Sequence, residues 1–323
     1  MNVRNKLEKI NITGKILRDV SMNLHTTFET GGSADYFALP SSVEDLVKLL
    51  NFAKKYSVPV FILGGGANIL VSDSGIRGLV VDMRNLSELR FEDTLCTAGA
   101  GCSISELADT AAGKNLGGLD FIYGMPGSVG GAVWMNARCY DVSISDILIK
   151  VDYLDEKLER RSLGADEISN SFAYKDSPFQ HSSSVILSAT FRLAKGDQKE
   201  IRKKMDQHKE DRESKGHYRY PCAGSVFKNN RAFGKPTGVI IDSLGLKGYS
   251  RGGAQIADFH GNIIVNTGNA RSKDIKSIVD YTRELTQREL GLKLETEIQF
   301  VGDWDGEEGE KETGDGRPED GKI

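Results

Sequence analysis

Two glycine-rich segments have the residue types and spacing of loops that bind phosphate. Residues 63–70 read LGGGANIL and follow an apolar run, and residues 124–131 read GMPGSVGG, with four glycines in eight positions. Because glycine lacks a Cβ atom, such loops reach positive φ angles and let backbone N–H groups converge on an anion. One such loop is explained equally well as a tight turn, but two loops favour a bound phosphate or dinucleotide. The candidate cofactor-binding residues are Gly64, Gly65, Gly66, Ala67, Asn68, Gly124, Pro126, Gly127, Ser128, Gly130 and Gly131.

Neither loop belongs to the two best-known phosphate-binding motifs. The first loop has no glycine three residues after Gly66, and neither loop shows the helix and acidic residue of a Rossmann unit. A P-loop, in which a lysine follows the glycines, is also absent from the sequence. The loops therefore indicate a phosphate ligand without assigning the chain to either class.

Several polar residues are candidates for acid, base or charge-stabilising roles, and each also has an ordinary structural interpretation. Ser225 follows a glycine, where serine is usually a turn residue. Glu297 alternates with apolar neighbours along a predicted strand, which is typical of a polar solvent face. Arg212 and Lys215 are either solvated side chains at a helix end or cations suited to a diphosphate. The residues alone leave these alternatives open.

Metal and disulfide chemistry are not indicated. Cys96, Cys102, Cys139 and Cys222 are scattered, without the two-residue spacing of a metal or redox motif. The five histidines show neither two-ligand helical spacing nor a pairing with the cysteines. His260, which precedes a glycine, is interpreted as a structural histidine in a turn. We therefore expect free thiols and no metal site.

The elements that would position these residues alternate between helix and strand. Residues 41–44 form a capping box before a helical pattern of apolar residues, and the next apolar run, 58–63, is a predicted strand ahead of the first glycine loop. Such alternation predicts an α/β or α+β fold. The further predicted elements are a strand at 79–81, a capped helix at 103–112, a strand at 185–191, a charged surface helix and domain boundary within 195–216, a strand at 262–265, a helix at 272–290 and a strand at 293–301.

Composition and charge exclude several classes of function. Hydrophobic residues make up 39% and charged residues 27% of the 323 positions, which is typical of a packed globular protein. The net charge of −4 includes an acidic tail, residues 303–323, with a charge of −6. The rest of the chain carries about +2, so nucleic acid is not a predicted partner. The tail has almost no apolar residues and is expected to be disordered.

The sequence also predicts where the protein works. No apolar run approaches the roughly 20 residues that span a bilayer, so we expect no membrane insertion. The charged N-terminus lacks the apolar stretch and cleavage site of a secretory signal. We therefore expect a cytoplasmic protein, and the sequence predicts no protein partner.

Ordered motifs in the first half of the chain resemble a known family. TTFETGGSAD at 26–35, LGGGANIL at 63–70 and GMPGSVGG at 124–131, followed by Met135 and Asn136, are similar to the flavin-binding half of UDP-N-acetylenolpyruvoylglucosamine reductase. This family of bacterial peptidoglycan enzymes has the vanillyl-alcohol-oxidase type of FAD-binding fold. The motifs occur in the same order, which makes the similarity specific.

The resemblance continues through the second half. AGSVFKN at 223–229, GLKG at 245–248 and LETE at 294–297 match the family, so that the similarity covers about residues 20–302. One form of the family carries an inserted, tyrosine-bearing segment between its flavin and substrate domains. Here only the charged helix lies in that position, so the chain resembles the shorter form.

The resemblance implies an α+β fold with defined domains. We expect a vanillyl-alcohol-oxidase-type FAD-binding domain at 1–195, made of two α/β lobes at about 1–90 and 91–195. A C-terminal α+β substrate-binding domain is expected at 196–302, followed by the disordered acidic tail at 303–323.

The resemblance also implies an activity. In this family NADPH reduces FAD, and reduced FAD then reduces the enolpyruvyl group of a UDP-sugar, UDP-N-acetylglucosamine enolpyruvate, to give UDP-N-acetylmuramate. Hydride addition to the β-carbon leaves negative charge at the α-carbon and its carboxylate, so the site needs a cation or acid and a proton donor. Ser225 matches the family's proton donor, and Glu297 matches a carboxyl group that stabilises the intermediate or orients the donor.

Lys175 matches a catalytic position that is normally arginine in the family. Lysine supplies a flexible point charge where arginine supplies a planar fork, so charge stabilisation survives but bidentate geometry does not. The positions that match the family's substrate contacts are Tyr174, Arg212, Lys215 and Asn229.

Two other interpretations stay open at this point. An oxidase of the same flavin fold would oxidise an alcohol or sugar, and many such oxidases bind flavin covalently through histidine. No histidine occurs between His25 and His181, so the glycine loops offer none for that bond. A non-catalytic flavin-binding module is the other interpretation, favoured by Lys175 in place of arginine and by Ala67 in place of the family's serine.

Overall fold

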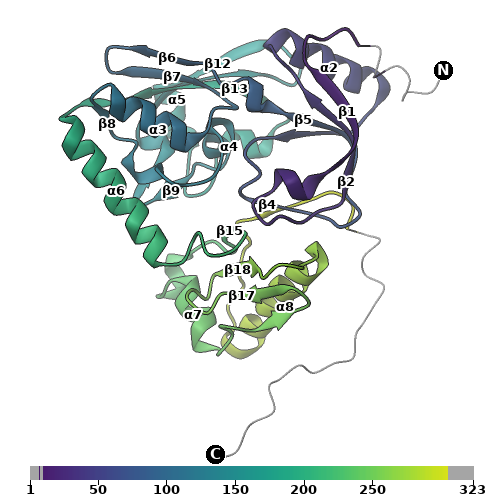
Figure 1. Cartoon of the computed structure of the whole chain (residues 1–323), viewed down its shortest axis with the longest axis vertical. Helices are drawn as coiled ribbons and strands as arrows, with labels where there is room; N and C mark the ends of the chain where they lie inside the picture. Colours follow the sequence, from purple (N-terminus) through teal and green to yellow (C-terminus); the bar gives the residue numbers. More distant parts are fainter. Residues whose placement is uncertain (1–6, 8–9, 305–323) are drawn as a thin grey trace, which may run out of the picture.

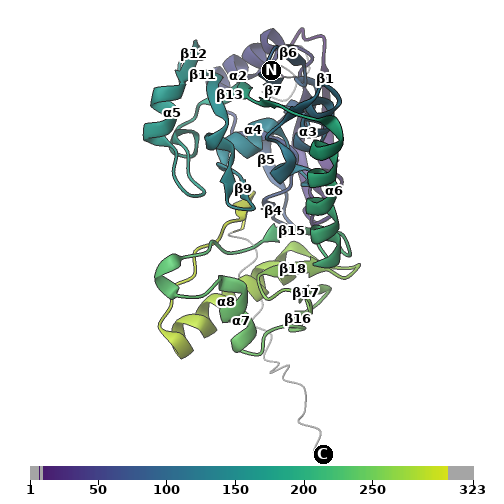
Figure 2. The same cartoon turned by 90° about the vertical axis from the view of Figure 1, so that its left-hand side faces the viewer.

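A computed structural model of the chain describes residue 7 and residues 10–304. In Figure 1 the N-terminal elements, coloured purple to teal, form one body, and the last part of the chain, green to yellow, forms a second body below it. Figure 2 shows the same two parts from the side. The predicted disordered tail lies outside the described residues, apart from its first two positions.

The first lobe of the N-terminal body contains a four-stranded sheet. Its order is β1-β2-β5-β3, with β1 and β2 antiparallel and the other neighbouring pairs parallel. The strands are β1 (Lys15–Ser21), β2 (Ser33–Leu39), β5 (Ile76–Asp82) and β3 (Val60–Leu63). The first glycine loop follows β3 directly, at the carboxyl end of a parallel strand.

Helix α2 (Val43–Tyr56) lies between β2 and β3 and buries Leu46 and Leu49. Its N-cap is Ser42, whose hydroxyl accepts a hydrogen bond from the Asp45 N–H at 3.2 Å. The helix therefore begins one residue later than the capping box at 41–44 predicts.

The second lobe contains a five-stranded antiparallel sheet in the order β12-β11-β13-β7-β6. Helices α3, α4 and α5 belong to this lobe, and α3 and α4 contribute buried side chains to the same core as the sheet. The elements are β6 (Leu89–Glu92), β7 (Leu95–Gly99), α3 (Ile104–Gly113), α4 (Val129–Trp134), β11 (Leu148–Leu154), β12 (Arg160–Gly164), α5 (Ala165–Ser171) and β13 (Val185–Arg192).

The C-terminal body has its own sheet and core. The sheet runs β15-β18-β17-β16, and helices α7 and α8 accompany it. Ile275, Ile278 and Val279 on one face of α8 are fully buried in this core. The elements are β15 (Cys222–Ser225), α7 (Thr237–Ser243), β16 (Ser250–Arg251), β17 (Ala254–Ile256), β18 (Ile263–Asn266) and α8 (Ser272–Leu290).

Short strands and 3₁₀ turns complete the fold. They are η1 (Met22–His25), β4 (Ile69–Val71), η2 (Met83–Asn85), β8 (Leu116–Gly117), η3 (Asp120–Ile122), β9 (Arg138–Cys139), β10 (Val142–Ser143), η4 (Ile144–Asp146), η5 (Pro178–His181), β14 (Ala194–Lys195), η6 (Arg231–Phe233) and β19 (Gln299–Val301). Strands β9 and β10 form a small hairpin, and β14 pairs with β8.

Both ends of the predicted substrate domain are attached to the N-terminal body. Helix α6 (Gln198–Ser214) buries Ile201 and Met205 in the core of the second lobe. At the other end, β19 pairs in parallel with β4, which follows the first glycine loop. The division into residues 1–195 and 196–302 stays a prediction, and these contacts join the two parts at two separate positions.

The predicted strand at 293–301 is regular only in its last three residues, which form β19. Upstream of β19 the chain contacts the segment after β15 through one bridge, between Phe227 and Thr296. Leu294 and Ile298 are buried, as the alternation predicts, but the polar position 297 between them is buried as well. Glu297 is accordingly only 9% exposed and faces the interior of the molecule.

Candidate active site

A cavity of about 1320 Å³ lies between the two glycine loops and the start of the C-terminal body. Its wall includes every residue of the first loop from Gly64 to Asn68. The wall also includes Pro126, Gly127, Ser128, Gly130 and Gly131 from the second loop. The proposed catalytic residues Lys175, Ser225 and Glu297 line the same cavity.

The two glycine loops contact each other so closely that side chains would not fit between them. A Cβ atom on Gly65 would lie 2.6 Å from the Gly127 Cα atom. Gly66 has φ +63°, and a Cβ atom there would lie 2.0 Å from the His25 carbonyl oxygen. Glycine is therefore required by the backbone at these positions.

The second loop leads into helix α4, and hydrogen bonds at the start of the helix fix its backbone. The Ser128 hydroxyl caps the helix by accepting a hydrogen bond from the Gly131 N–H at 3.3 Å. The Gly130 N–H donates to the Ala100 carbonyl at 2.8 Å. Gly127 adopts φ +134°, which non-glycine residues avoid. At Gly127, Gly130 and Gly131 the loop presents backbone to the cavity.

These observations fit a bound FAD. Two glycine loops form a cradle in which the backbones lie too close together for side chains at Gly65 and Gly66, and the cavity continues from them along apolar side chains that would suit flat rings. The cradle would hold the diphosphate through Gly64, Gly65, Gly127 and Ser128.

Lys175 and Glu297 form an ion pair inside the cavity. Lys175 Nζ donates to Glu297 Oε1 at 2.5 Å, and each side chain is only 12% exposed. Lys175 adopts a left-handed conformation, φ +56°, in a turn that lies between α5 and η5. A non-glycine residue in this region is strained, and such strain is retained where the surroundings fix the backbone.

The backbones on both sides of this ion pair are held by hydrogen bonds from the N-terminal body. Gln180 Nε2 donates to the Lys175 carbonyl at 3.1 Å and to the Trp134 carbonyl, at the end of α4, at 2.9 Å. Asn68 Nδ2, in the first glycine loop, donates to the Glu297 carbonyl at 3.0 Å. The two glycine-loop segments therefore position both members of the pair.

Ser225 ends strand β15 and pairs with Ile263 of β18. It lines the cavity together with Lys175 and Glu297, and Gly224 before it has φ +70°. The structure thus brings together three residues that lie far apart in the sequence.

Two further cations that line the cavity lie at the end of α6. Arg212 Nε donates to the Tyr218 hydroxyl at 3.2 Å, and Lys215 Nζ donates to Asp211 Oδ2 at 2.7 Å. Both Arg212 and Lys215 line the cavity. Tyr140, in the turn between β9 and β10, also donates to Asp211, at 2.8 Å, and so fixes the helix end to the N-terminal body.

Three of the predicted site residues are not part of the cavity wall. Asn229 uses its side-chain oxygen to accept from the Thr237 N–H at 2.8 Å, at the start of α7. Tyr174 is 46% exposed, and Gly124 lies beside Tyr218 rather than on the wall.

Two histidines and two cysteines line the cavity where the sequence assigns none of them a role. His217 and His260 have ring centroids 6.4 Å apart. Burial, with help from the Arg212 charge, lowers the pKa of His217 to about 4, and burial also lowers the pKa of His260. Cys139 and Cys222 line the wall as free thiols. Isolated histidines and cysteines carry no spacing signal that could have identified them.

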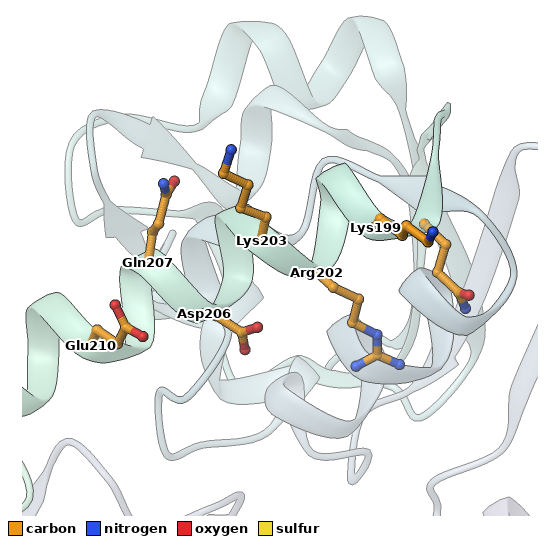
Figure 3. A pocket seen from close by; sticks show the side chains of 7 residues that line it. Lys199, Arg202, Lys203, Asp206, Gln207 and Glu210 are labelled. Atoms are coloured by element: carbon orange, nitrogen blue, oxygen red, sulfur yellow. The ribbon is translucent and has the colours of Figure 1, made fainter.

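A second hollow follows the exposed face of α6 and is shown in Figure 3. Its wall consists of charged and amide side chains from this one helix, such as Arg202, Asp206 and Glu210. It is the solvated side of a surface helix and contains no convergent site. Among the described residues, no group of three or more His, Cys, Asp or Glu side chains is arranged to hold a metal ion. Within the same part of the chain, no helix has the length and apolar content needed to cross a membrane.

The fold and the glycine cradle define an FAD-dependent oxidoreductase. Residues 34–164 match the family model of an FAD-binding domain, and residues 216–301 match the C-terminal domain of UDP-N-acetylenolpyruvoylglucosamine reductase. FAD is the cofactor that this domain binds, and the expected two-lobed flavin fold with an α+β C-terminal domain is confirmed.

The relatives identify the family. UDP-N-acetylenolpyruvoylglucosamine reductase of Treponema denticola is 40% identical, over 86% of this chain and 91% of its own length. The same enzyme of Borreliella burgdorferi is 38% identical, over 93% and 98% respectively. The crystal structure of the Thermus caldophilus reductase, at 28% identity, has a TM-score of 0.74 and covers 90% of this chain and all of its own. This chain belongs to the UDP-N-acetylenolpyruvoylglucosamine reductase family, and the resemblance predicted from the sequence is confirmed.

Proposed function

We propose that this chain uses FAD and NADPH to reduce the enolpyruvyl group of UDP-N-acetylglucosamine enolpyruvate, giving UDP-N-acetylmuramate for peptidoglycan precursor synthesis, through Lys175, Ser225 and Glu297. The observation that carries the assignment of residues is their shared cavity with the two glycine loops. A cation, a hydroxyl and a carboxylate then face the position that the cradle leaves for a flavin.

FAD, when bound, supplies the hydride that is added to the substrate's β-carbon. The chain's own task is to stabilise the negative charge that this addition leaves at the α-carbon and its carboxylate. Lys175 supplies a positive charge in a largely buried position, where charge stabilisation is stronger than in water. Its partner Glu297 keeps the ammonium group in place, because a lysine side chain alone is flexible.

Ser225 is the proposed proton donor to the α-carbon. A serine hydroxyl is a very weak acid, so it acts only when the acceptor carbon already has carbanion character. The proton on Ser225 must then be restored from water. The β15 strand holds the Ser225 backbone through its pairing with β18, which keeps the hydroxyl in the cavity throughout the reaction.

Arg212 and Lys215 are the proposed contacts of the UDP diphosphate, since both are cations that line the cavity and neither belongs to the Lys175–Glu297 pair. Asn229 and Tyr174 are not included in the proposed site. Asn229 accepts a hydrogen bond at the start of α7, and Tyr174 is 46% exposed and not among the residues that line the cavity, so their substrate contacts stay predictions.

The visible spectrum of the purified protein tests the proposal. We expect flavin absorbance that bleaches when NADPH is added and recovers when enolpyruvyl-UDP-N-acetylglucosamine follows under anaerobic conditions. Recovery only with oxygen, after reduction by an alcohol or sugar, would assign the chain to the oxidases of this fold. A flavin that NADPH does not bleach would leave a binding module without catalysis.

A further inference from the structure

Tyr218 joins the cation at the end of α6 to the second glycine loop. Its hydroxyl accepts a hydrogen bond from Arg212 Nε at 3.2 Å and donates one to the Gly124 carbonyl at 2.8 Å. The Arg212 guanidinium carbon also lies 5.8 Å from the centre of the Tyr218 ring. Arg212 is therefore held by both the hydroxyl and the face of one tyrosine.

The contact with the loop is close enough to require glycine. A Cβ atom on Gly124 would lie 2.6 Å from the Tyr218 hydroxyl oxygen, and Gly124 has φ +75°. The loop backbone thus comes near the ring because position 124 has no side chain. Gly124 does not line the cavity, and its contact with Tyr218 explains why a glycine stands at this position.

Arg212 and Lys215 are held by different kinds of partner. Lys215 is paired with the carboxylate of Asp211 at 2.7 Å, which neutralises most of its charge. The hydrogen-bond partners of the Arg212 guanidinium are neutral groups, the Tyr218 hydroxyl and the Cys139 thiol. A neutral partner fixes the direction of a guanidinium and leaves its charge available to an anion.

A neighbouring thiol shows that the Arg212 charge acts within the cavity. Burial raises the pKa of Cys139, and the Arg212 guanidinium beside it opposes part of that rise. Cys139 and Arg212 both line the cavity. The guanidinium therefore faces the interior wall, although its stem lies at the end of a surface helix.

We infer that Tyr218 is a positioning residue for substrate binding. It holds Arg212 toward the diphosphate of the UDP-sugar, and its own hydroxyl is fixed by a hydrogen bond to the flavin-binding loop. The inference rests on the proposed role of Arg212. A long side chain loses considerable rotamer freedom when it binds an anion, and a pre-oriented side chain loses less. Tyr218 therefore acts on the affinity for the substrate rather than on the reacting carbon.

The test is the steady-state kinetics of Tyr218→Phe, which keeps the ring and removes both hydrogen bonds. We expect KM for the UDP-sugar to rise about three- to ten-fold, the usual effect of losing one ordinary hydrogen bond. We expect kcat to change less than about two-fold, because the residue contributes to ground-state and transition-state binding alike. Tyr281→Phe, which removes a hydroxyl from α8 outside the cavity, is the control and should leave both constants unchanged.

A double-mutant cycle separates this inference from the proposed function. Arg212→Ala should raise KM, and in that background Tyr218→Phe should change KM less than about two-fold, because its effect passes through Arg212. All variants are assayed below the temperature at which any of them begins to unfold.

Each contrary result has a distinct meaning. If Arg212→Ala raises KM and Tyr218→Phe does not, or if the effect of Tyr218→Phe persists fully without Arg212, the positioning role is overturned and the proposed function stands. If Arg212→Ala leaves KM unchanged, the proposed diphosphate contact is wrong and the inference fails with it.

Discussion

The two sides of the cavity hold their cations in opposite ways. Lys175 is 12% exposed and directly paired with a carboxylate, whereas Arg212 is oriented by neutral groups, the Tyr218 hydroxyl and the Cys139 thiol. A buried ammonium without a counter-ion would lose its proton or destabilise the fold, so a paired carboxylate is needed on the Lys175 side. The Arg212 side is nearer to solvent and keeps an unpaired charge for an anionic ligand.

This difference indicates that the positive charges of Lys175 and Arg212 have two different roles. At the reacting carbon, position matters more than net charge, because stabilisation depends on an aligned group in a dry site. At the diphosphate, the ligand itself supplies the counter-charge, so the free protein gains by leaving the cation available. Substitutions on the two sides should therefore change different kinetic constants.

The largest effect is expected from Ser225→Ala. NADPH should still bleach the flavin of this variant, because flavin reduction requires no proton at the substrate's α-carbon. Re-oxidation of the flavin by the UDP-sugar should slow about a hundred- to ten-thousand-fold, the usual contribution of general acid catalysis. Stopped-flow absorbance of the flavin follows the two steps separately. Re-oxidation at the wild-type rate would remove Ser225 from the mechanism.

Substitutions of Lys175 test whether charge or shape matters on the paired side. Lys175→Ala leaves Glu297 buried without a cation and should slow re-oxidation about a hundred- to a thousand-fold. Lys175→Arg restores a cation and should stay within about ten-fold of the wild type, since the Lys175 turn and its partner are unchanged. An inactive Lys175→Arg variant, if folded and flavin-loaded, would mean that the site is shaped around lysine.

The glycine cradle offers a test that does not depend on turnover. Gly65→Val would drive its side chain into the Gly127 backbone, so the flavin content of the purified protein should fall to less than about a tenth. Gly113→Ala, in α3, is the matched control because a Cβ atom there meets nothing within 4 Å. Full flavin content in a folded Gly65→Val variant would show that FAD binds elsewhere.

Much of the cavity on the side of the Lys175–Glu297 pair could be predicted from the sequence, because it depends on local motifs. The strand before the first glycine loop was expected at 58–63 and is observed at Val60–Leu63, and the helix at Ser272–Leu290 matches its predicted range. The glycine loops were identified because their backbone requirement is encoded in residue type. Ser225 and Lys175 were found only through the resemblance to a family, since a serine or lysine in a turn has no distinctive spacing.

The parts that could not be predicted depend on contacts between distant segments. The alternation around Glu297 indicated a solvated strand face, but the segment before β19 is irregular and Glu297 is buried next to Ile298. The pairing of β19 with β4 joins residues more than 200 positions apart and leaves no local pattern. The link between Tyr218 and Gly124 is of the same kind.

Comparison of Arg212→Ala with Lys215→Ala tests the difference between the two cations directly. Arg212→Ala should raise KM for the UDP-sugar about ten- to one-hundred-fold, because an available charge is lost. Lys215→Ala should raise it less than about five-fold, because Asp211 already neutralises an exposed lysine. Equal effects of the two substitutions would contradict the distinction between a free and a paired cation.

The smallest predicted effect concerns His217, which lies beside the unpaired Arg212 charge. Burial, then Arg212, His260 and Lys215, lower the pKa of His217 to about 4, whereas Asp211 opposes them. An unfolded histidine titrates near pH 6.5, so between pH 6.5 and 4 the unfolded chain binds a proton that the folded chain does not. The free energy of unfolding should therefore fall as the pH falls through that window.

His217→Asn should reduce this loss of unfolding free energy at low pH. Because His217 is partly open to solvent, its share is about 1 kcal/mol, or about 2–4 °C in Tm, between pH 6.5 and 4. Thermal unfolding of the wild type and His217→Asn at a series of pH values measures the difference. In Arg212→Ala the His217 pKa, followed by NMR titration, should move up toward 6.5. A pKa that stays near 4 in that variant would show that burial and the other neighbouring charges set it and that the Arg212 charge does not reach His217.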